Sequence, residues 1–235
     1  LGVIPARLDS QRLPGKVLLK IGPKPMIHWV YDRARQSTLL HHILVATDSE
    51  RVLEYCTSQS IAVMHTRRHP SGSDRLHEVM ERTDADIYVN VQGDEPLLPV
   101  AGVERLIAVM KAEKNLVMGT LAARSADPEA AARRDVVKVV RSRDGMALYF
   151  SRSPVPSGPG PFLQHIGVYL YRRSFLLGYG SLPRGPMEKR EDLEQLRALE
   201  NGFGIRVVEC GGKSLGVDRP EDIKRVEKRI EKRLR

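Results

Sequence analysis

Short apolar runs alternate with amphipathic stretches along the first hundred residues of the chain. The runs predict strands at 1–4, 43–46, 61–64 and 87–91, and the stretches between them predict helices at 26–36, 49–58 and 73–82. Strands that alternate with helices favour a mostly parallel sheet with right-handed crossovers. Because the runs are continuous rather than alternating, we expect the strands to be covered on both faces.

The pattern changes after about residue 115. Two short apolar runs flank Asp144-Gly145, a dipeptide typical of hairpin turns, and a Pro/Gly-rich loop and another strand follow. The predicted elements are strands at 136–140, 146–150 and 165–171, a loop at 154–161 and a helix at 187–201. The sequence therefore predicts one α/β domain over 1–235: a Rossmann-like, mostly parallel sheet with helices on both faces and an inserted β-rich lobe.

Length and composition agree with a globular chain. The protein has 235 residues, of which 41% are hydrophobic and 29% charged, so an intrinsically disordered body is excluded. No uncharged apolar run approaches 18 residues, so we expect no transmembrane helix. Arg7 and Asp9 interrupt any signal-peptide pattern, and we expect a cytoplasmic protein. Cys56 and Cys210 could form one disulfide, but two buried thiols fit a reducing compartment better.

The net charge of +9 raises the question of nucleic-acid binding. More than half of it comes from residues 223–235, which hold seven Lys or Arg and two Glu. Ile223, Val226, Ile230 and Leu234 share one stripe at helical spacing, so the basic residues occupy the opposite face. Such a face is usually a solvated helix surface. We therefore expect neither a nucleic-acid partner nor a membrane partner.

A basic loop follows the first predicted strand. Arg7, Arg12 and Lys16 lie within ten positions of one another, and Ser10 and Gly15 leave room for backbone N–H groups to approach phosphate. Ligands of open α/β sheets bind outside the carboxyl ends of strands, so a triphosphate could bind at this loop. The spacing matches neither the P-loop nor the dinucleotide-binding glycine pattern. A solvated basic turn is the alternative reading.

The loop, Arg-x-x-Ser-x-Arg-Leu-Pro-Gly-Lys, resembles the start of cytidylyltransferases that activate acidic sugars. Further segments follow in order: His-Pro-Ser-Gly-Ser-Asp-Arg at 69–75, Val-Asn-Val-Gln-Gly-Asp-Glu-Pro at 89–96, Ala-Leu-Tyr-Phe-Ser-Arg-Ser-Pro at 147–154, His-Ile-Gly-Val-Tyr at 165–169, Leu-Glu-Gln-Leu-Arg at 193–197 and Gly-Val-Asp at 216–218. Together they resemble the 3-deoxy-manno-octulosonate (Kdo) cytidylyltransferase, or CMP-Kdo synthetase, family. The resemblance covers nearly the whole chain. Asp9 departs from it, because the family has a small residue there.

The resemblance implies a CTP site made of Arg7, Ser10, Arg12, Lys16, Arg75 and Gln92, with Lys16, Arg12 and Asp94 as catalytic residues. Arg75 and Gln92 resemble the residues that read the cytosine edge. Gln92 offers both a donor and an acceptor, as a pyrimidine with an exocyclic amine requires. For Arg75 the alternative is a surface ion pair with Asp74 or Glu78. The resemblance places the CTP half in residues 1–120.

The resemblance also implies a Mg²⁺ cofactor held by Asp94 and Asp218. Asp94 directly follows a predicted buried strand, where one or two carboxylates with phosphates and waters suit Mg²⁺. A turn-forming role is its alternative. Asp218 precedes Arg219-Pro220-Glu221, so an ordinary helix N-cap would also explain it.

The sugar site implied by the resemblance lies in residues 121–215, the lobe that would also form a homodimer. Its members would be Arg152, facing the sugar carboxylate, and His165, Tyr169, Glu194 and Gln195, bonding hydroxyls. The alternatives are a core histidine satisfied by backbone at 165 and an ordinary exposed helix turn at 194–195.

The implied reaction is a direct displacement, in which the anomeric hydroxyl of Kdo attacks the α-phosphorus of CTP and pyrophosphate leaves, for lipopolysaccharide biosynthesis. Three alternatives remain open. The first is the same chemistry with another acidic sugar, such as amino-Kdo or sialic acid. The second is a glycosyltransferase, although its Asp-x-Asp is missing at 94–96. The third is a non-enzymatic nucleotide or nucleic-acid binder.

Overall fold

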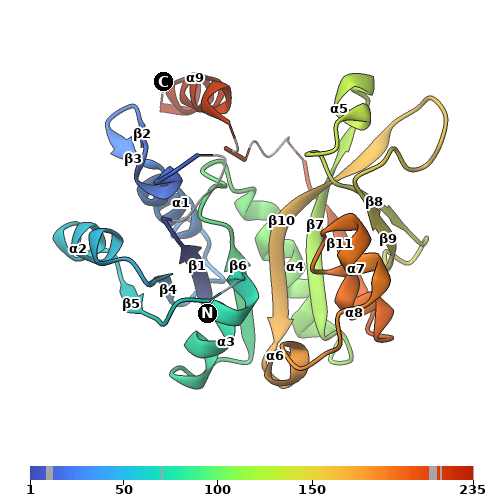
Figure 1. Ribbon diagram of the computed structural model, residues 1–235, viewed down its shortest axis with the longest axis horizontal. Helices are drawn as coiled ribbons and strands as arrows, with labels where there is room; N and C mark the ends of the chain where they lie inside the picture. Colours follow the sequence, from blue (N-terminus) through green and yellow to red (C-terminus); the bar gives the residue numbers. More distant parts are fainter. Residues whose placement is uncertain (9–12, 70, 212–215, 218, 235) are drawn as a thin grey trace. The chain divides into compact units, whose positions relative to one another are not determined.

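A computed structural model describes residues 1–8, 13–69, 71–211, 216–217 and 219–234 of the chain (Figure 1). The fold divides into two compact units. The first comprises Leu1–Val100 and Ser214–Arg235, and the second comprises Ala101–Lys213. The second therefore contains most of the segment predicted as an inserted lobe.

The first unit is built on four parallel strands in the order β6-β1-β4-β5. They are β1 (Gly2–Ala6), β4 (Ile43–Thr47), β5 (Val63–His65) and β6 (Ile87–Val91). All four were predicted from apolar runs, with β6 exact and the boundaries of the other three within two residues. The central strands are almost wholly buried, as continuous apolar runs predict.

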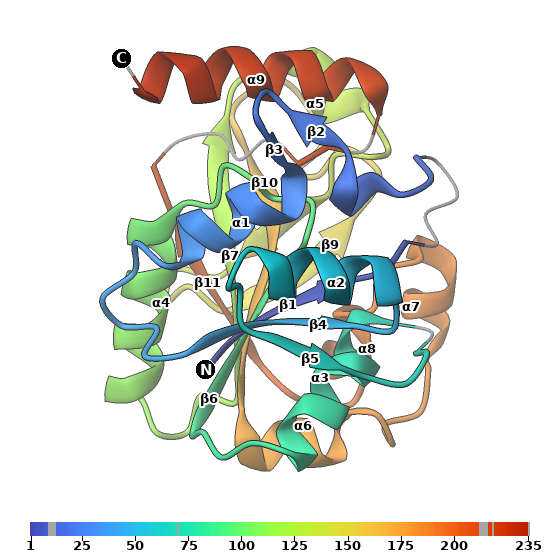
Figure 2. The same cartoon turned by 90° about the vertical axis from the view of Figure 1, so that its left-hand side faces the viewer.

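The chain winds this sheet in two directions. From β1 it passes through α1 (Met26–Ala34) to β4 and through α2 (Glu50–Ser58) to β5, and then returns through α3 (Gly72–Glu81) to β6. Because such crossovers are right-handed, reversing the direction moves the helix to the other face. Figure 2 shows α1 and α2 on one side of the strands and α3 on the other. The carboxyl ends of β1 and β6 therefore form a topological switch point, where open α/β sheets bind ligands.

Small elements complete the first unit. A 3₁₀ turn, η1 (Lys16–Leu18), leads into the hairpin of β2 (Lys20–Ile21) and β3 (Lys24–Pro25), and α9 (Pro220–Leu234) closes the unit. Val226 and Ile230 of α9 are buried in a cluster with Ile21, and Ile223 packs against it. The predicted apolar stripe is confirmed at these three positions, and the side chain of Leu234 lies outside the described residues.

The second unit is rich in β-structure. Its strands are β7 (Met118–Ser125), β8 (Lys138–Arg141), β9 (Ala147–Ser151), β10 (Phe162–Arg172) and β11 (Ile205–Glu209). β7 pairs antiparallel with β10 and parallel with β11, and β8 pairs antiparallel with β9 and β10. The helices are α4 (Val100–Ala112), α5 (Pro128–Ala132), α6 (Arg173–Tyr179), α7 (Pro186–Glu191) and α8 (Leu196–Glu200). The predicted hairpin about Asp144-Gly145 is confirmed.

The predicted helix at 187–201 is wrong. It is two short helices, α7 and α8, separated by Asp192 in the left-handed region (φ 52°). The carboxylate of Glu200 accepts the N–H groups of Met187 and Glu188, both at 2.9 Å, at the start of α7. In one continuous helix, residues 188 and 200 would lie roughly 18 Å apart. The break therefore allows α8 to cap α7, a long-range contact that helical periodicity does not encode.

Both cysteines are buried thiols, as expected, and they form no disulfide. Burial raises the pKa of the Cys56 thiol to about 11. Among the described residues, the longest apolar helical stretch falls short of what crossing a membrane requires.

Gly93 marks the closest approach at the switch point. A Cβ at this position would lie 2.9 Å from the carbonyl oxygen of Pro5 and 3.4 Å from Val17. Since the first contact is with backbone, a side chain could be accommodated only if β1 and the residues after β6 moved apart.

We expect Gly93→Ala to lower the free energy of unfolding by roughly 1–3 kcal/mol, because overpacking forces backbone shifts. Thermal unfolding followed by circular dichroism measures this loss. Gly178→Ala is the matched control, since a Cβ there meets nothing within 4 Å, and it should leave the melting temperature unchanged or raise it slightly. Equal melting temperatures for the two variants would contradict the close approach.

Candidate active site

The basic loop closes on itself beside the end of β1. Gly15, with φ of 68°, donates its N–H to the carbonyl oxygen of Leu8 at 3.1 Å, and Lys16 begins η1 directly after it. Arg7 is exposed immediately after the last residue of β1. Ser10 and Arg12, together with Asp9, lie outside the described residues. The described ends of the loop thus place Arg7 and Lys16 at the carboxyl edge of the sheet.

Lys16 and Asp94 form an ion pair at this edge. The Nζ of Lys16 donates to Oδ2 of Asp94 at 2.5 Å, and both side chains are partly buried. They come from the segments that follow β1 and β6, so the switch point itself brings them together. A pair with restricted solvent access interacts more strongly than one on the surface. The sequence placed both residues at a phosphate site, and the structure shows them in contact.

The segment before Asp218 reaches the same point. Val217 donates its N–H to the carbonyl oxygen of Asp94 at 3.0 Å, and a Cβ on Gly216 would lie 3.4 Å from Oε1 of Glu95. Asp218 itself lies outside the described residues. A cation shared by Asp94 and Asp218 stays a prediction. Among the described residues, no three His, Cys, Asp or Glu side chains are grouped as a metal site.

The hydrogen bonds at the start of α9 bear on the alternative that Asp218 caps this helix. This helix begins at Pro220, and the carboxylate of Asp222 accepts the N–H of Arg219 at 3.0 Å. One N-terminal donor is thus already capped from within the helix.

Arg75 is not the surface ion pair considered above. It is only 2% exposed, and its guanidinium donates to Oγ1 of Thr66 at 2.5 Å and to Oδ1 of Asp48 at 3.0 Å. These partners follow β5 and β4, so the arginine of α3 ties together the carboxyl ends of neighbouring strands. Neither Asp74 nor Glu78 is its partner. Contact of Arg75 with a nucleobase stays a prediction.

Gln92 lies just beyond β6, and its side-chain amide makes no hydrogen bond with a described residue. Asn90, two residues earlier, was not recognised from the sequence. It is 1% exposed, and its Oδ1 is buried without a partner. Sequence alone did not single it out, because an Asn within an apolar strand gives no sign of whether its amide is paired.

In the second unit, His165 and Tyr169 lie on β10 on either side of a bulge in its pairing with β7. The ring of His165 packs against Tyr169 at 5.3 Å and against Phe150 at 5.2 Å, centroid to centroid. Bulges are often found next to active sites, where they redirect side chains. The aromatic series continues from Tyr169 to Tyr171.

His165 is held as one neutral tautomer. Its Nε2 lies 2.9 Å from Oγ1 of Thr120, and that hydroxyl donates its single proton to the carbonyl oxygen of Val168 at 2.7 Å. Nε2 must therefore carry a proton and donate, which leaves Nδ1 as an acceptor. Burial lowers the pKa of His165 to about 3. The satisfied-histidine alternative is correct for Nε2, although its partner is a threonine hydroxyl rather than backbone.

Arg152 anchors the end of β9. Its guanidinium donates to the carbonyl oxygens of Glu191 at 2.7 Å, Asp192 at 3.0 Å and Arg134 at 3.2 Å. Three of its five N–H donors are thus used on backbone, and two are left. Contact with a sugar carboxylate stays a prediction for these two donors.

Two residues that sequence reasoning missed hold Arg152 in place. The Oε2 of Glu191 accepts a hydrogen bond from the backbone N–H of Arg152 at 2.8 Å, and its Oε1 accepts one from the hydroxyl of Ser151 at 3.0 Å. Burial alone would raise the pKa of Glu191, but these hydrogen bonds outweigh it and hold the pKa below its ordinary value. Lys138, fully buried, donates to the carbonyl oxygens of Arg133, Val136 and Arg152. A buried Lys within a strand was the available signal.

Glu194 and Gln195 lie in the turn between α7 and α8, not on a continuous helix. The hydroxyl of Tyr179 donates to the carbonyl oxygen of Glu194 at 3.0 Å. Glu188 of α7 is 2% exposed, and its carboxylate accepts two hydrogen bonds from the guanidinium of Arg197 in α8, at 2.9 and 2.7 Å. Gln195 is 4% exposed, and its Nε2 is buried without a partner. The turn is rigidly held and keeps one unused donor, which excludes an ordinary exposed turn.

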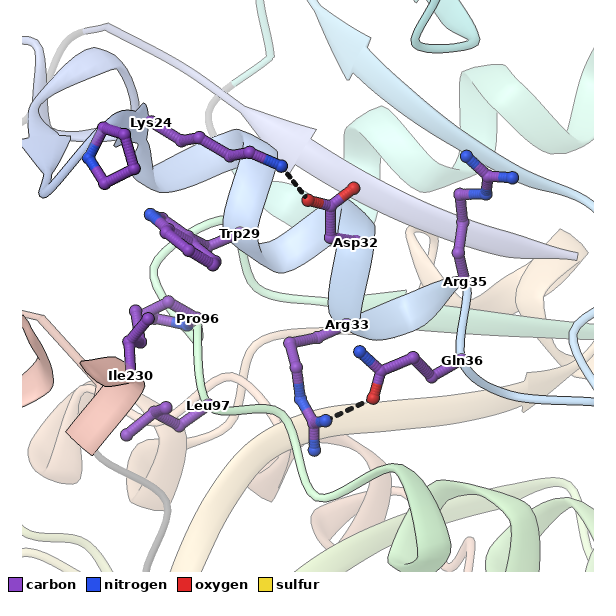
Figure 3. Close-up of a pocket in the computed structure, with 10 residues that line it drawn as sticks. Lys24, Trp29, Asp32, Arg33, Arg35, Gln36, Pro96, Leu97 and Ile230 are labelled. Carbon is purple, nitrogen blue, oxygen red and sulfur yellow. Dashed lines mark hydrogen bonds and ion pairs between the residues drawn. The ribbon is translucent and has the colours of Figure 1, made fainter. Parts of the chain in front are cut away.

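A cavity of about 730 Å³ lies elsewhere in the first unit, beside α1 (Figure 3). Trp29, Pro96, Leu97 and Ile230 give it an apolar wall. Its charged groups already have protein partners: Lys24 pairs with Asp32 at 2.7 Å. None of the predicted site residues lines this cavity.

The doubly wound sheet, with a cation–carboxylate pair at its switch point, defines an α/β protein of the nucleotide-binding class. The family model for cytidylyltransferases matches residues 1–215. The chain is 49% identical to the 3-deoxy-manno-octulosonate cytidylyltransferase of Solibacter usitatus, over 96% of this chain and 92% of the relative. It is 45% identical to that of Geobacter metallireducens, over 97% and 96%. The chain belongs to the cytidylyltransferase family and, within it, to the 3-deoxy-manno-octulosonate cytidylyltransferases.

Solved structures agree. A CMP:2-keto-3-deoxy-manno-octonic acid synthetase complexed with CTP superposes with a TM-score of 0.94 at 42% identity, covering 99% of this chain and 98% of that one. A putative glucose-1-phosphate thymidylyltransferase from Bacillus anthracis gives a TM-score of 0.65 at 17% identity, over 97% and 93%, which shows the fold alone. The predicted fold class and family are both confirmed.

We expect the imidazole of His165 to stay neutral down to about pH 4, because its pKa in the native protein is about 3. The unfolded chain takes up this proton near pH 6.5, so the contribution of His165 to stability is complete above that pH and declines as the pH falls towards 3. Imidazole NMR shifts between pH 8 and 4.5 measure this directly. The exposed His41 gives the reference imidazole signal in the same spectra. A midpoint near 6.5 for His165 would refute its desolvation.

Proposed function

We propose that this protein transfers CMP from CTP to the anomeric hydroxyl of Kdo, giving CMP-Kdo and pyrophosphate in lipopolysaccharide biosynthesis. The Lys16–Asp94 pair at the switch point is the observation that carries the proposal. It places a cation and a potential metal ligand where an α/β sheet binds phosphates. The family membership supplies the nucleotide and the sugar.

The CTP half of the proposal rests on the first unit. Arg7 and Lys16, with Ser10 and Arg12, bind the triphosphate, and Gln92 and Arg75 lie towards the base. Lys16 and Arg12 stabilise the charge that develops as pyrophosphate leaves. When Lys16 turns to phosphate, Asp94 is released from its ion pair and its carboxylate becomes available.

Asp94 and Asp218 would hold Mg²⁺. The backbone bond between Val217 and Asp94 supports this pairing. A bound Mg²⁺ polarises the α-phosphate and makes the attacking hydroxyl more acidic. The number of protein ligands matches the habit of Mg²⁺, which takes one or two carboxylates and completes its shell with phosphates and waters.

The sugar half rests on the second unit. Nδ1 of His165 accepts a hydrogen bond from a sugar hydroxyl, and the unpaired Nε2 of Gln195 donates one. Tyr169 and Glu194 bond further hydroxyls, and the two remaining donors of Arg152 face the carboxylate. Because Lys138, Glu191 and Tyr179 fix the backbone around these groups, little ordering remains when the sugar binds.

Homodimerisation through the second unit is part of the proposal. Leu148 on β9 is 62% exposed, so covering it with a second copy of the chain would remove apolar surface from water. We place the protein in the cytoplasm, where CTP is available.

The deciding assay measures pyrophosphate release from CTP and Kdo in the presence of Mg²⁺. We expect turnover with this pair, little turnover with ATP, GTP or UTP, and loss of activity on removal of Mg²⁺ with EDTA. Running the same assay with an amino analogue of Kdo and with sialic acid ranks the alternative sugars. Binding of CTP without turnover of any acidic sugar would instead indicate a nucleotide-binding module.

Lys16→Ala should lower kcat more than it raises the KM for CTP. The ammonium meets charge that grows as pyrophosphate leaves, and losing one such contact costs about 10²–10³ in rate. Steady-state kinetics with CTP varied at saturating Kdo measure the two constants. Lys20→Ala, an exposed lysine four residues further on, is the control and should be silent. A raised KM with unchanged kcat would assign Lys16 to ground-state binding only.

Asp218→Asn distinguishes a metal ligand from a helix cap. Asn caps a helix as well as Asp does, so a capping role predicts near-normal activity and stability. Asn is neutral, so a metal role predicts a large loss of rate with partial recovery at high Mg²⁺. We expect the loss, with an unchanged melting temperature, and a more complete loss in Asp94→Asn. Normal activity and normal Mg²⁺ dependence would leave Asp94 as the sole carboxylate ligand.

A further inference from the structure

Asn90 carries a buried amide whose hydrogen-bonding capacity goes unused. It lies in the middle of β6 and is 1% exposed. Its Oδ1 is buried without a hydrogen-bond partner, and its Nδ2 also makes no hydrogen bond with a described residue. Buried polar side chains are nearly always paired, because leaving one unpaired sacrifices its hydration without return. An exception at this position calls for a ligand.

The sheet register fixes the direction in which the amide points. Asn90 lies in β6 and Gln92 directly follows the strand, so one further extended residue puts both side chains on the same face. Val3 is the register partner of Asn90, which puts Pro5, two residues on, on that face as well. A Cβ on Gly72, the first residue of α3, would lie 3.8 Å from Nδ2 of Asn90. The amide therefore faces the start of α3.

The phosphate-binding groups occupy the opposite face. A Cβ on Gly93 would meet Val17 and Ile27, which belong to η1 and α1. Lys16, also in η1, is bonded to Asp94 next to this glycine. At the carboxyl edge of β6, the Lys16–Asp94 ion pair thus lies towards α1, whereas the amides of Asn90 and Gln92 lie towards α3.

The first residue of α3 puts no side chain in front of Asn90. Gly72 has none, and a methyl group there would sit 3.7 Å from Pro5 and 3.8 Å from Asn90, at ordinary contact distances. The adjacent Ser73 is small. A neutral donor–acceptor pair beside a glycine and a proline suits the edge of a flat heterocycle, which presents both donors and acceptors, whereas a phosphate presents acceptors and could use only the donor.

We propose that Asn90 is a specificity-determining residue that reads the pyrimidine of the nucleotide together with Gln92. The Nδ2 of Asn90, which faces Gly72, donates to the unprotonated ring nitrogen of cytosine, and the unpartnered Oδ1 accepts from the adjacent exocyclic amine. Uracil carries an N–H at that position, so the same donor opposes it. The inference rests on the proposed nucleotide specificity for CTP and adds the group that enforces it.

The test is Asn90→Leu, which keeps the size of the side chain and removes both polar atoms. We expect kcat/KM for CTP to fall about tenfold or more and kcat/KM for UTP to change little, so that the preference for CTP collapses. The KM for Kdo should not change. Because the variant removes an unpaired buried amide, its melting temperature should be equal or higher. An intact CTP/UTP ratio in the folded variant would overturn the proposal.

Two further variants check the interpretation of Asn90→Leu. Thr47→Val is the matched control: Thr47 ends β4, its hydroxyl accepts a hydrogen bond from Ser49 at 3.1 Å, and its side chain lies on the other face. It should leave the CTP/UTP ratio unchanged. Gly72→Ala keeps Asn90 but puts a methyl group before the amide, and it should reproduce the loss of preference. If Asn90→Leu does not fold, this ratio in Gly72→Ala decides, and a retained ratio overturns the proposal.

Equilibrium binding separates this inference from the proposed function. Calorimetry with CMP and UMP, in the absence of sugar, needs no turnover. We expect the wild-type protein to prefer CMP and Asn90→Leu to bind the two equally. This result in a protein that fails to turn over Kdo would retain Asn90 as the base reader and reject the proposed reaction. Turnover of CTP and Kdo with an unchanged nucleotide preference in the variant would retain the proposed reaction and reject Asn90 as the base reader.

Discussion

The contact between Gly93 and the carbonyl oxygen of Pro5 is the constraint on which the first unit depends. A Cβ on Gly93 would lie 2.9 Å from that oxygen, so the missing side chain is what allows the carboxyl ends of β1 and β6 to come this close at the switch point. The basic loop leaves from one of these ends and Asp94 from the other, so Lys16 and Asp94 meet because the strands do. The bond from Val217 to Asp94 then brings the start of the last segment to the same place. Three distant parts of the sequence thus converge without a dedicated scaffold.

The second unit is held in a different way: its buried charged side chains form several hydrogen bonds each, many of them with backbone groups. Lys138 spends all three of its protons on carbonyl oxygens, and Arg152 spends three of its five. Glu191 and Glu188 accept from several donors, which holds the pKa of each below its ordinary value against the effect of burial. These side chains therefore hold the surrounding backbone in position. The atoms left for a ligand include two neutral ones, Nδ1 of His165 and Nε2 of Gln195, and the two remaining donors of Arg152.

The unsatisfied groups of the described residues are as informative as the satisfied ones. Asn90 in the first unit and Gln195 in the second each keep a buried amide atom without a partner, next to residues that resemble binding residues of the family. A protein that pairs nearly every other buried polar side chain sacrifices stability at these two places. Such local sacrifices are expected where a site must be complementary to a ligand rather than to itself.

The sequence by itself determined the winding of the first unit, because apolar runs and amphipathic stretches alternate there with clear periods. It also determined the family and most candidate residues, since several ordered motifs converge on one resemblance. Only the tertiary structure decided that residues 187–201 form two helices, because the capping of α7 by Glu200 is a contact between residues twelve positions apart. Only the structure showed that Arg75 pairs with Asp48 and Thr66, and that the Asn90 amide has no partner. Periodicity reports which face of an element is buried, whereas the partner of a polar atom depends on residues that folding brings from elsewhere in the chain.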